Sequence, residues 1–295
     1  MSRLISPLPA LPAVPALMLS ILSVQGGAAI AKGVFPLVGA TGTTGLRIGL
    51  SALILLLVFR PAVLRLSAQQ WRAVLPYGVV LGVMNLLFYL ALARIPLGLA
   101  VTLEFVGPLL LAVAGSRRAL DVLWVVLAGV GVAMITPWSG AGIDGLGVLL
   151  ALLAGACWAT YVLLGSRVSQ VLPSGTGVAV GMSVATLTVA PFVLLFGHWD
   201  RLTPEVLLTG TALAVLSSAV PFTLELVALR TLPPKIFGVL LSLEPAVAAI
   251  CGVVFLHEVL RPSQWIAVVL VAAASGGVAL AAPKAPPTQV QAVAA

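Results

Sequence analysis

Three ionisable residues lie deep inside long apolar stretches, where no water can solvate a charge. They are Glu104, Glu244 and Arg47. An ionised side chain at the centre of a bilayer costs from about 2.5 to more than 10 kcal/mol, so such residues mark functional sites by default. The alternative is a buried Arg–Glu pair that only locks helices together. Together, a carboxylate and a guanidinium at this depth could bind the ammonium and the carboxylate of a small zwitterion.

Each glutamate lies beside a proline that alters the local backbone hydrogen bonds. Pro108 follows Glu104 by four residues, and Pro245 follows Glu244 directly. Because proline has no N–H for the carbonyl four residues earlier, Pro108 frees the carbonyl of Glu104 and Pro245 frees that of Leu241. Freed carbonyls beside a carboxylate are typical of the broken helices that line transporter cavities. A simple kink is the alternative.

Neutral polar and aromatic side chains at similar depth could complete such a site. We expect four of them to supply hydrogen-bonding groups and the fifth, a tryptophan, to form a wall. The five residues are Gln25, Asn85, Tyr89, Tyr161 and Trp158. For a single Tyr or Trp, packing between helices is the commoner role. Glu225, near the end of an apolar stretch, is either a partly solvated interfacial carboxylate or a further site residue.

The composition places these residues in a membrane protein. Of 295 residues, 61% are hydrophobic and only 8% are charged, and the mean hydropathy is +1.21. Soluble domains carry about 25% charged residues, so a cytosolic enzyme, a secreted disulfide scaffold and a disordered protein are excluded. A spanning helix takes about 20 residues, so ten such helices leave no length for a catalytic domain outside the membrane.

The apolar stretches and the turn and charge signals between them predict ten spans. The ranges are 13–31, 39–59, 73–93, 95–114, 119–136, 146–164, 176–196, 206–229, 236–256 and 263–282. With the N-terminus inside, ten basic residues fall in inner segments and four in outer loops, which places both termini in the cytoplasm. Residues 1–12 form a cytoplasmic segment, and 283–295 form a disordered tail. The prolines before residue 16 and Gln25 favour an uncleaved first span over a signal peptide.

An internal repeat relates the two glutamates. A shift of 140 residues aligns GLAVTLEFVGP, which contains Glu104, with GVLLSLEPAVA, which contains Glu244. We therefore expect two repeats, 13–140 and 141–282, with five spans each. Because five is odd, the second repeat enters the membrane inverted, and transporters built in this way bind substrate near the midplane at the repeat interface. The predicted fold is all-α, a polytopic membrane protein of two inverted five-helix repeats.

Enzyme motifs are missing from the sequence. It contains no HExxH, GxSxG or P-loop motif, so we expect no enzyme activity and no ATP hydrolysis. The isolated Cys157 and Cys251 and the scattered basic residues predict no metal, no cofactor and no nucleic-acid partner. Concentrative transport would then use an ion gradient, most simply protons exchanged by Glu104 or Glu244. A drug or metabolite exporter of the same architecture, a membrane-embedded enzyme and a passive pore remain as alternatives.

Four segments carry a family resemblance. They are SVQGGAAIAKGVFPLVGATGTTGLRIGL (23–50), NLLFYLALARIPLGLAVTLEFVGPLLLA (85–112), GACWATYVLLG (155–165) and PFTLELVALRTLPPKIFGVLLSLEPAVAA (221–249). The chain resembles the threonine/homoserine exporters, a ten-span branch of the drug/metabolite transporter superfamily, from about residue 13 to 282. The resemblance implies efflux of threonine and homoserine across a bacterial inner membrane. It also implies a central cavity lined by both repeats and site roles for Gln25, Arg47, Glu104, Glu225 and Glu244. His257, in LHEVL, stands where the resemblance predicts a glycine.

Overall fold

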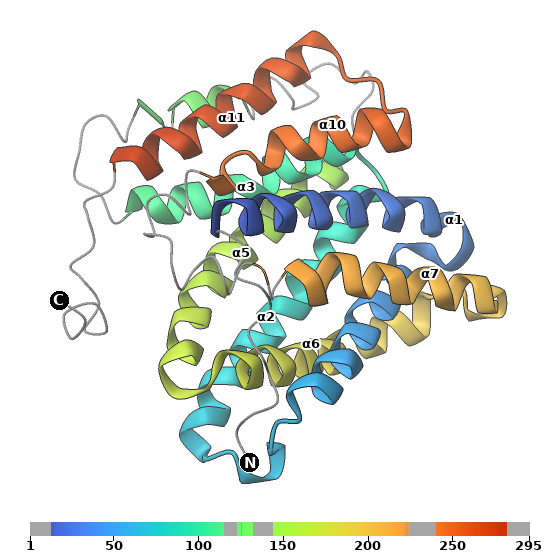
Figure 1. The fold of residues 1–295 in the computed structure, drawn as a ribbon. Coiled ribbons are helices and arrows are strands. Elements are labelled where there is room, and N and C mark those ends of the chain that lie inside the picture. The colour runs from blue at the N-terminus through green and yellow to red at the C-terminus, as the bar shows by residue number, and fades with distance from the viewer. Residues whose placement is uncertain are drawn as a thin grey trace.

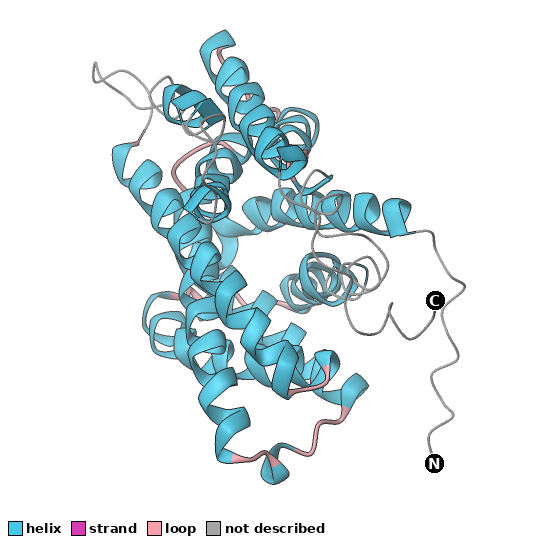
Figure 2. Cartoon of the chain, turned by 90° about the vertical axis from the view of Figure 1, so that its left-hand side faces the viewer, coloured by secondary structure: helices cyan, strands magenta, loops and turns pink. Residues whose placement is uncertain are grey.

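The computed structural model describes residues 13–114, 123–124, 126–131, 144–221, 224 and 240–281, and every regular element in these ranges is helical (Figure 2). Two short 3-10 helices, η1 (Val63–Arg65) and η2 (Trp199–Arg201), lie in loops. The longer elements are α1 (Ala13–Phe59), α2 (Ala68–Leu92), α3 (Leu97–Ala114), α5 (Gly145–Val171), α6 (Ser174–Phe196), α7 (Pro204–Ala214), the π-helical turn η3 (Val215–Ala219), α10 (Glu244–Leu256) and α11 (Pro262–Ala281).

Length and apolar character confirm an all-helical, multi-pass membrane protein. Within the described ranges, four helices are long and apolar enough to cross a bilayer, at 14–59, 68–92, 145–165 and 175–196. Large apolar side chains on their outer faces stay uncovered, such as Leu195 with 76% of its surface exposed. Such side chains suit contact with lipid. The finer arrangement, ten spans in two inverted repeats, stays a prediction.

The expected loop between the first two spans is wrong. Residues 32–38 are helical, and α1 continues through Pro36 to a single break at Gly39, whose φ of 75° and ψ of 167° suit glycine only. Figure 1 shows the two parts of α1 running in different directions on either side of this break. Lys32 therefore lies in a helix rather than in a loop, and it has polar partners there, as described below.

Several other boundaries differ from the predicted ones. The third span begins at residue 68 rather than 73, because Ser67 and Gln70 form a capping box at its start. The helix expected over 146–164 runs to Val171. The expected fifth span is described only over 123–124 and 126–131, and the end of the eighth and the start of the ninth lie outside the described residues. Glu244 is not midway along a helix: a turn at 242–243 precedes it, and α10 begins at Glu244.

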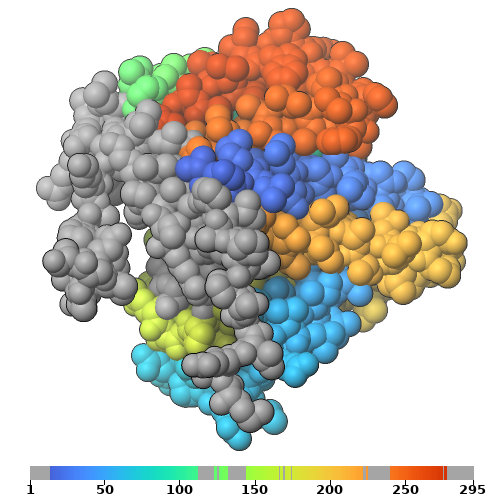
Figure 3. Space-filling view, viewed as in Figure 1, coloured from blue at the N-terminus to red at the C-terminus, as the bar shows by residue number. Residues whose placement is uncertain are grey.

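Small residues set how closely the helices pack. Gly78 and Gly82 of α2 lie against the backbone of α6, and Gly155 of α5 lies against the backbone of α3. Gly98 of α3 packs on Ala249 of α10. Such close backbone approach is the main source of association between helices in lipid. In the space-filling view, α11 with α10, the first part of α1, and α7 form successive layers (Figure 3).

Segments that the prediction places on one side of the membrane do lie near one another. At the predicted outer side, the backbone N–H of His198 donates to the Val38 carbonyl (3.2 Å), and Arg94 pairs with Asp144 (2.8 Å). At the predicted inner side, Gln70 Nε2 donates to the Val171 carbonyl at 3.1 Å. The parity of the ten spans, and which side of the membrane faces the cytoplasm, both stay predictions.

Candidate functional site

Arg47 lies at the centre of a buried polar cluster. It belongs to the second part of α1, and only 9% of its surface is exposed. Its guanidinium carbon lies 5.0 Å from the ring centroid of Tyr89, and its Nη1 donates to the Ser217 carbonyl at 3.4 Å. A desolvated cation over an aromatic ring is stabilised by about 2 kcal/mol. Helices α1 and α2 and the turn η3 thus meet at this guanidinium.

Glu104 supplies the opposite charge from the middle of α3. Its side chain is buried, with 8% exposed, and it interacts electrostatically with Arg47. The two residues, both within the described part of the chain, attract each other without forming a direct ion pair. Cys157 of α5 also lies within electrostatic range of Glu104. The Arg47 guanidinium keeps unused hydrogen-bonding capacity, because its Nε has no partner.

The backbone around Glu104 matches the expectation from Pro108. The carbonyl of Glu104 cannot receive the missing N–H of Pro108, and Gly155 of α5 packs directly against that carbonyl. Gly107 packs in turn against the carbonyl of Gly155. Cα–H groups in such contacts are weak donors to carbonyl oxygens. The freed carbonyl is therefore covered by a neighbouring helix and not left open to a cavity.

Helix α2 contributes Tyr89 and Asn85. Tyr89 is 1% exposed, and its ring packs on Phe35 with centroids 5.7 Å apart. The Tyr89 hydroxyl lies toward Ser217, but the geometry of a hydrogen bond is not met and the oxygen has no partner. Asn85 is buried and donates from Nδ2 to the Leu81 carbonyl of its own helix at 2.7 Å. Of the two side chains, only Tyr89 touches the Arg47 guanidinium.

Gln25 lies in the first part of α1, before the break at Gly39, whereas Arg47 lies in the second part. It is buried, and its Oε1 has no hydrogen-bond partner. Helical spacing puts it on the same face as Ala28, Ala29 and Lys32, three, four and seven residues later. Ala28 and Ala29 pack in the same apolar cluster as the start of α3 and the middle of α10. Gln25 therefore faces the helices that carry Glu104 and Glu244 rather than the turn η3.

Glu244 is buried at the first turn of α10, with 7% of its surface exposed. The N-terminus of a helix favours a negative charge, and Pro245 suits the first helical position. Helix α10 packs on α3 where Gly98 meets Ala249. Glu104 and Glu244 thus lie on two contacting helices, and neither faces lipid.

The remaining predicted site residues lie apart from Arg47. The Tyr77 hydroxyl donates to that of Tyr161 at 3.2 Å, and the two rings stack with centroids 5.0 Å apart between α2 and α5. Trp158 meets Phe105 edge-on at 5.1 Å. Both contacts have the geometry of helix packing. Glu225 lies outside the described residues.

Ser217 and Ser218 of η3 are not among the site residues that the sequence predicts. Both are buried, and neither hydroxyl has a partner. The available signal was Pro221, which cannot donate to the Ser217 carbonyl four residues earlier, next to a pair of serines at span depth. Extra residues inserted as π-helical turns are frequent at functional sites.

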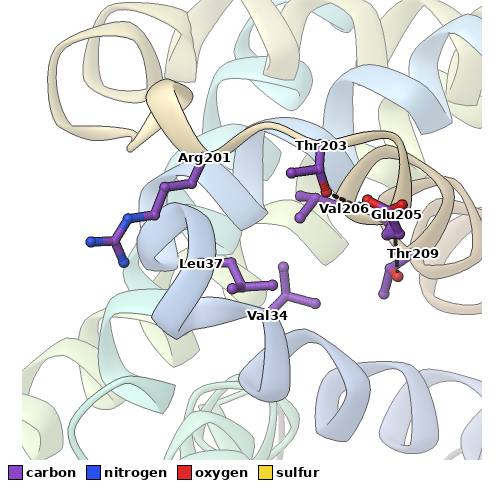
Figure 4. Close-up of a pocket in the computed structure, with 7 residues that line it drawn as sticks. All are labelled: Val34, Leu37, Arg201, Thr203, Glu205, Val206 and Thr209. Carbon is purple, nitrogen blue, oxygen red and sulfur yellow. Dashed lines mark hydrogen bonds between the residues drawn. The ribbon is translucent and has the colours of Figure 1, made fainter.

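Two open hollows lie on the outside of the described structure, away from this cluster. One has a volume of about 380 Å³ and lies between α1 and the start of α7 (Figure 4). Its lining consists of Val34, Leu37, Arg201, Thr203, Glu205, Val206 and Thr209. The other, of about 440 Å³, lies between α2 and α6. Neither hollow includes a predicted site residue, so the candidate site is the packed polar cluster around Arg47.

The fold and the buried charges define a multi-pass membrane transporter, and comparison with known proteins agrees. Residues 145–280 match the EamA-like transporter family. The chain is 45% identical over 267 residues to the threonine/homoserine exporter RhtA of Escherichia coli (strain K12), covering 88% of each chain. It is 43% identical over 277 residues to RhtA of Salmonella typhimurium (strain LT2), covering 92% of each. The chain belongs to the family of threonine/homoserine exporters, which are transporters and not enzymes.

A solved structure supports the fold. A crystal structure of a protein with 20% sequence identity superposes with a TM-score of 0.62, covering 90% of this chain and 97% of that chain. At this identity the likeness concerns the helical architecture alone.

Proposed function

We propose that this protein exports threonine and homoserine across a bacterial inner membrane in exchange for protons. The similarity to the exporters RhtA over 88% of the chain carries the choice of substrate. The buried charges of Arg47 and Glu104 supply matching chemistry, because a small amino acid brings one cation and one anion. Glu104 receives the ammonium group of the substrate, and Arg47 receives its carboxylate.

The proposed architecture has ten spans in two inverted repeats, 13–140 and 141–282, with both termini in the cytoplasm. The contacts between predicted same-side segments support this parity. Residues 1–12 and 283–295 are terminal segments outside the repeats. Two similar halves of opposite orientation can exchange conformations, so that a site between them opens alternately to either side.

The other proposed site residues come from the helices that carry or contact this pair of charges. Gln25 faces α3 and α10 and offers an acceptor to the hydroxyl of the substrate. Tyr89 and Asn85 approach from α2, and Glu244 from α10. Tyr161 and Trp158 complete the proposal as more distant contributors, and Glu225, outside the described residues, is proposed from the sequence alone.

Substrate choice is tested by overexpression. Cells carrying the chain should resist toxic concentrations of homoserine and threonine and should gain no resistance to lipophilic dyes. Glu104→Gln should abolish the amino-acid resistance, because an amide cannot neutralise the ammonium group. Glu205→Gln, the same change at the exposed start of α7, serves as the matched control and should keep it. Dye resistance alone would favour a drug exporter of this fold.

Proton coupling is tested in proteoliposomes with an imposed pH gradient. Either Glu104 or Glu244 must alternate between protonated and ionised forms, and each is replaced by Gln in turn. We expect at least one variant to exchange threonine without responding to the gradient. Undiminished gradient-driven efflux in both variants would remove proton antiport by these residues.

A further inference from the structure

Unpartnered polar atoms gather where α1, α2 and η3 meet. Arg47 Nε, the Tyr89 hydroxyl and Ser217 Oγ are each buried without a hydrogen-bond partner. Folded proteins satisfy more than about 90% of such groups, and each exception costs about 1–3 kcal/mol. Three exceptions at one place are unusual. Each of the three groups can donate a proton, and none of these protons has an acceptor in hydrogen-bonding geometry.

The Ser217 hydroxyl, like that of its neighbour Ser218, makes no bond to its own helix. Serine and threonine inside a helix commonly bond the carbonyl four residues earlier. Thr102, Thr186 and Thr209 do so here, at 2.6–2.8 Å. Ser217 makes no such bond. Its hydroxyl lies toward Tyr89 instead, in space that Gly27 leaves free by having no side chain.

The widened turn is held in place from both parts of α1. Ser23 donates to the Leu216 carbonyl at 2.6 Å. The Ser51 hydroxyl shares its proton between the Arg47 carbonyl of its own helix at 2.5 Å and the Ala214 carbonyl at 3.2 Å. Arg47 donates to the Ser217 carbonyl, which Pro221 cannot serve. Three side chains of α1 thus satisfy carbonyls of this segment. The backbone of η3 is fixed, and the Ser217 side chain is left as a positioned donor.

We infer that Ser217, Tyr89 and Arg47 form the subsite for the carboxylate of the transported amino acid, with Ser217 as a specificity-determining residue. A carboxylate only accepts hydrogen bonds, at about four lone-pair positions, and binds guanidinium strongly. It can therefore accept hydrogen bonds from all three groups at once, none of which has a partner in the structure. This inference rests on the proposed function and adds that selection for a free carboxylate depends on η3.

The test compares threonine with threonine amide, which keeps the ammonium and hydroxyl groups but has no carboxylate. Uptake of labelled threonine into inside-out proteoliposomes is measured against each unlabelled competitor. The wild type should prefer threonine over the amide. Ser217→Ala should weaken the apparent affinity for threonine at least about tenfold, as for a lost hydrogen bond to a charged group. The amide keeps only a neutral carbonyl acceptor, so its binding should weaken much less and the preference for threonine should fall.

Tyr89→Phe tests the same subsite with little risk to folding, because it removes one oxygen and keeps the ring beside Arg47. It should lower the preference for threonine in the same way. Ser183→Ala is the matched control, since Ser183 lies in α6 and bonds its own helix at 2.8 Å. An unchanged preference in both variants, or equal loss for threonine and the amide, would overturn the inference. Failure of the wild type to transport threonine would instead overturn the proposed function.

Discussion

Arg47 is a buried cation whose partners do not use all of its donors. The guanidinium donates one hydrogen bond to a carbonyl, lies over the ring of Tyr89 and is attracted by Glu104. Its Nε has no acceptor. Burying an incompletely paired charge is expensive, and a purely structural lock between helices would be more stable with a direct ion pair. The incomplete pairing is explained when a substrate carboxylate supplies the missing acceptors.

Arg47→Lys keeps the charge and removes the planar fork. An ammonium group cannot bind a carboxylate with two parallel hydrogen bonds while it stacks on Tyr89. We expect threonine transport to fall more than about tenfold at low substrate, measured as initial uptake in proteoliposomes. Arg201→Lys, at an exposed position, is the control and should transport normally. Normal transport by the Arg47→Lys variant would mean that the charge alone suffices.

The sequence identifies the charged residues of the site but not the serines. Arg47, Glu104 and Glu244 are visible because a charge in an apolar stretch needs an explanation. Ser217 carries no such signal, because most hydroxyls at span depth bond their own helix. Its orientation depends on the widened turn, which in turn depends on donors from α1, about 170 residues away in sequence. Tyr161 is predicted as a site residue, but in the structure it contacts Tyr77 of another helix, and the sequence alone does not reveal such a contact.

At the scale of helices, α3 and α5 meet backbone to backbone. The sequence predicts the freed carbonyl of Glu104, but not that Gly155 covers this carbonyl. The prediction of a loop at 32–38 is wrong because it, too, depends on contacts between distant parts of the chain. A single glycine at position 39 can turn α1 without a loop, and Lys32 can stay in the helix because it finds partners across the fold.

Gly155→Ala tests this helix contact. An added Cβ would overlap the Glu104 carbonyl and its Cα, which are backbone atoms that cannot move alone. We expect a destabilisation of about 1–3 kcal/mol, seen as a lower midpoint of thermal unfolding in detergent. Gly145→Ala, in the same helix but with open space around the Cα, should show no such loss. Equal midpoints for the two variants would contradict the close contact.

We expect Asp144, at the N-terminus of α5, to make the thermal stability of the protein depend on pH. Asp144 accepts hydrogen bonds from Arg94 and from the backbone N–H groups of Gly147 and Leu146, and these bonds hold its pKa below the usual 3.8. Because the pKa of Asp144 is lower in the folded than in the unfolded state, its ionised form stabilises the fold at pH values above the unfolded-state pKa. This stabilisation is lost as the pH falls through the folded-state pKa. The wild type should therefore unfold at a higher temperature than Asp144→Asn at neutral pH. The gap should close as pH falls below about 4. A gap that stays constant with pH would exclude an ionised cap.

At the scale of the whole molecule, one network joins segments of both proposed repeats. Lys32 Nζ donates to the Ile95 carbonyl at 2.9 Å and to Glu258 Oε1 at 2.6 Å. Glu258 Oε2 accepts from the backbone N–H of Leu97, the first residue of α3, at 2.9 Å. The two side chains are 23% and 11% exposed, so water screens the ion pair only in part. If the repeats move against each other, this connection at the predicted outer end must separate in each cycle.

Lys32→Met should therefore favour the arrangement that is open to the outer side. For a partly exposed pair, losing about 1–2 kcal/mol corresponds to a roughly 5- to 30-fold shift in the equilibrium. Cys157, half-buried and within electrostatic range of Glu104, reports this opening in a Cys251→Ser background. A membrane-impermeant maleimide applied to intact cells should label Cys157 faster in the Lys32→Met variant than in Arg261→Met, which removes an exposed charge at the same end. Equal labelling rates would show that the Lys32–Glu258 connection does not hold the repeats closed. If the connection did stabilise the closed arrangement, removing it would increase the fraction of molecules open to the outer side.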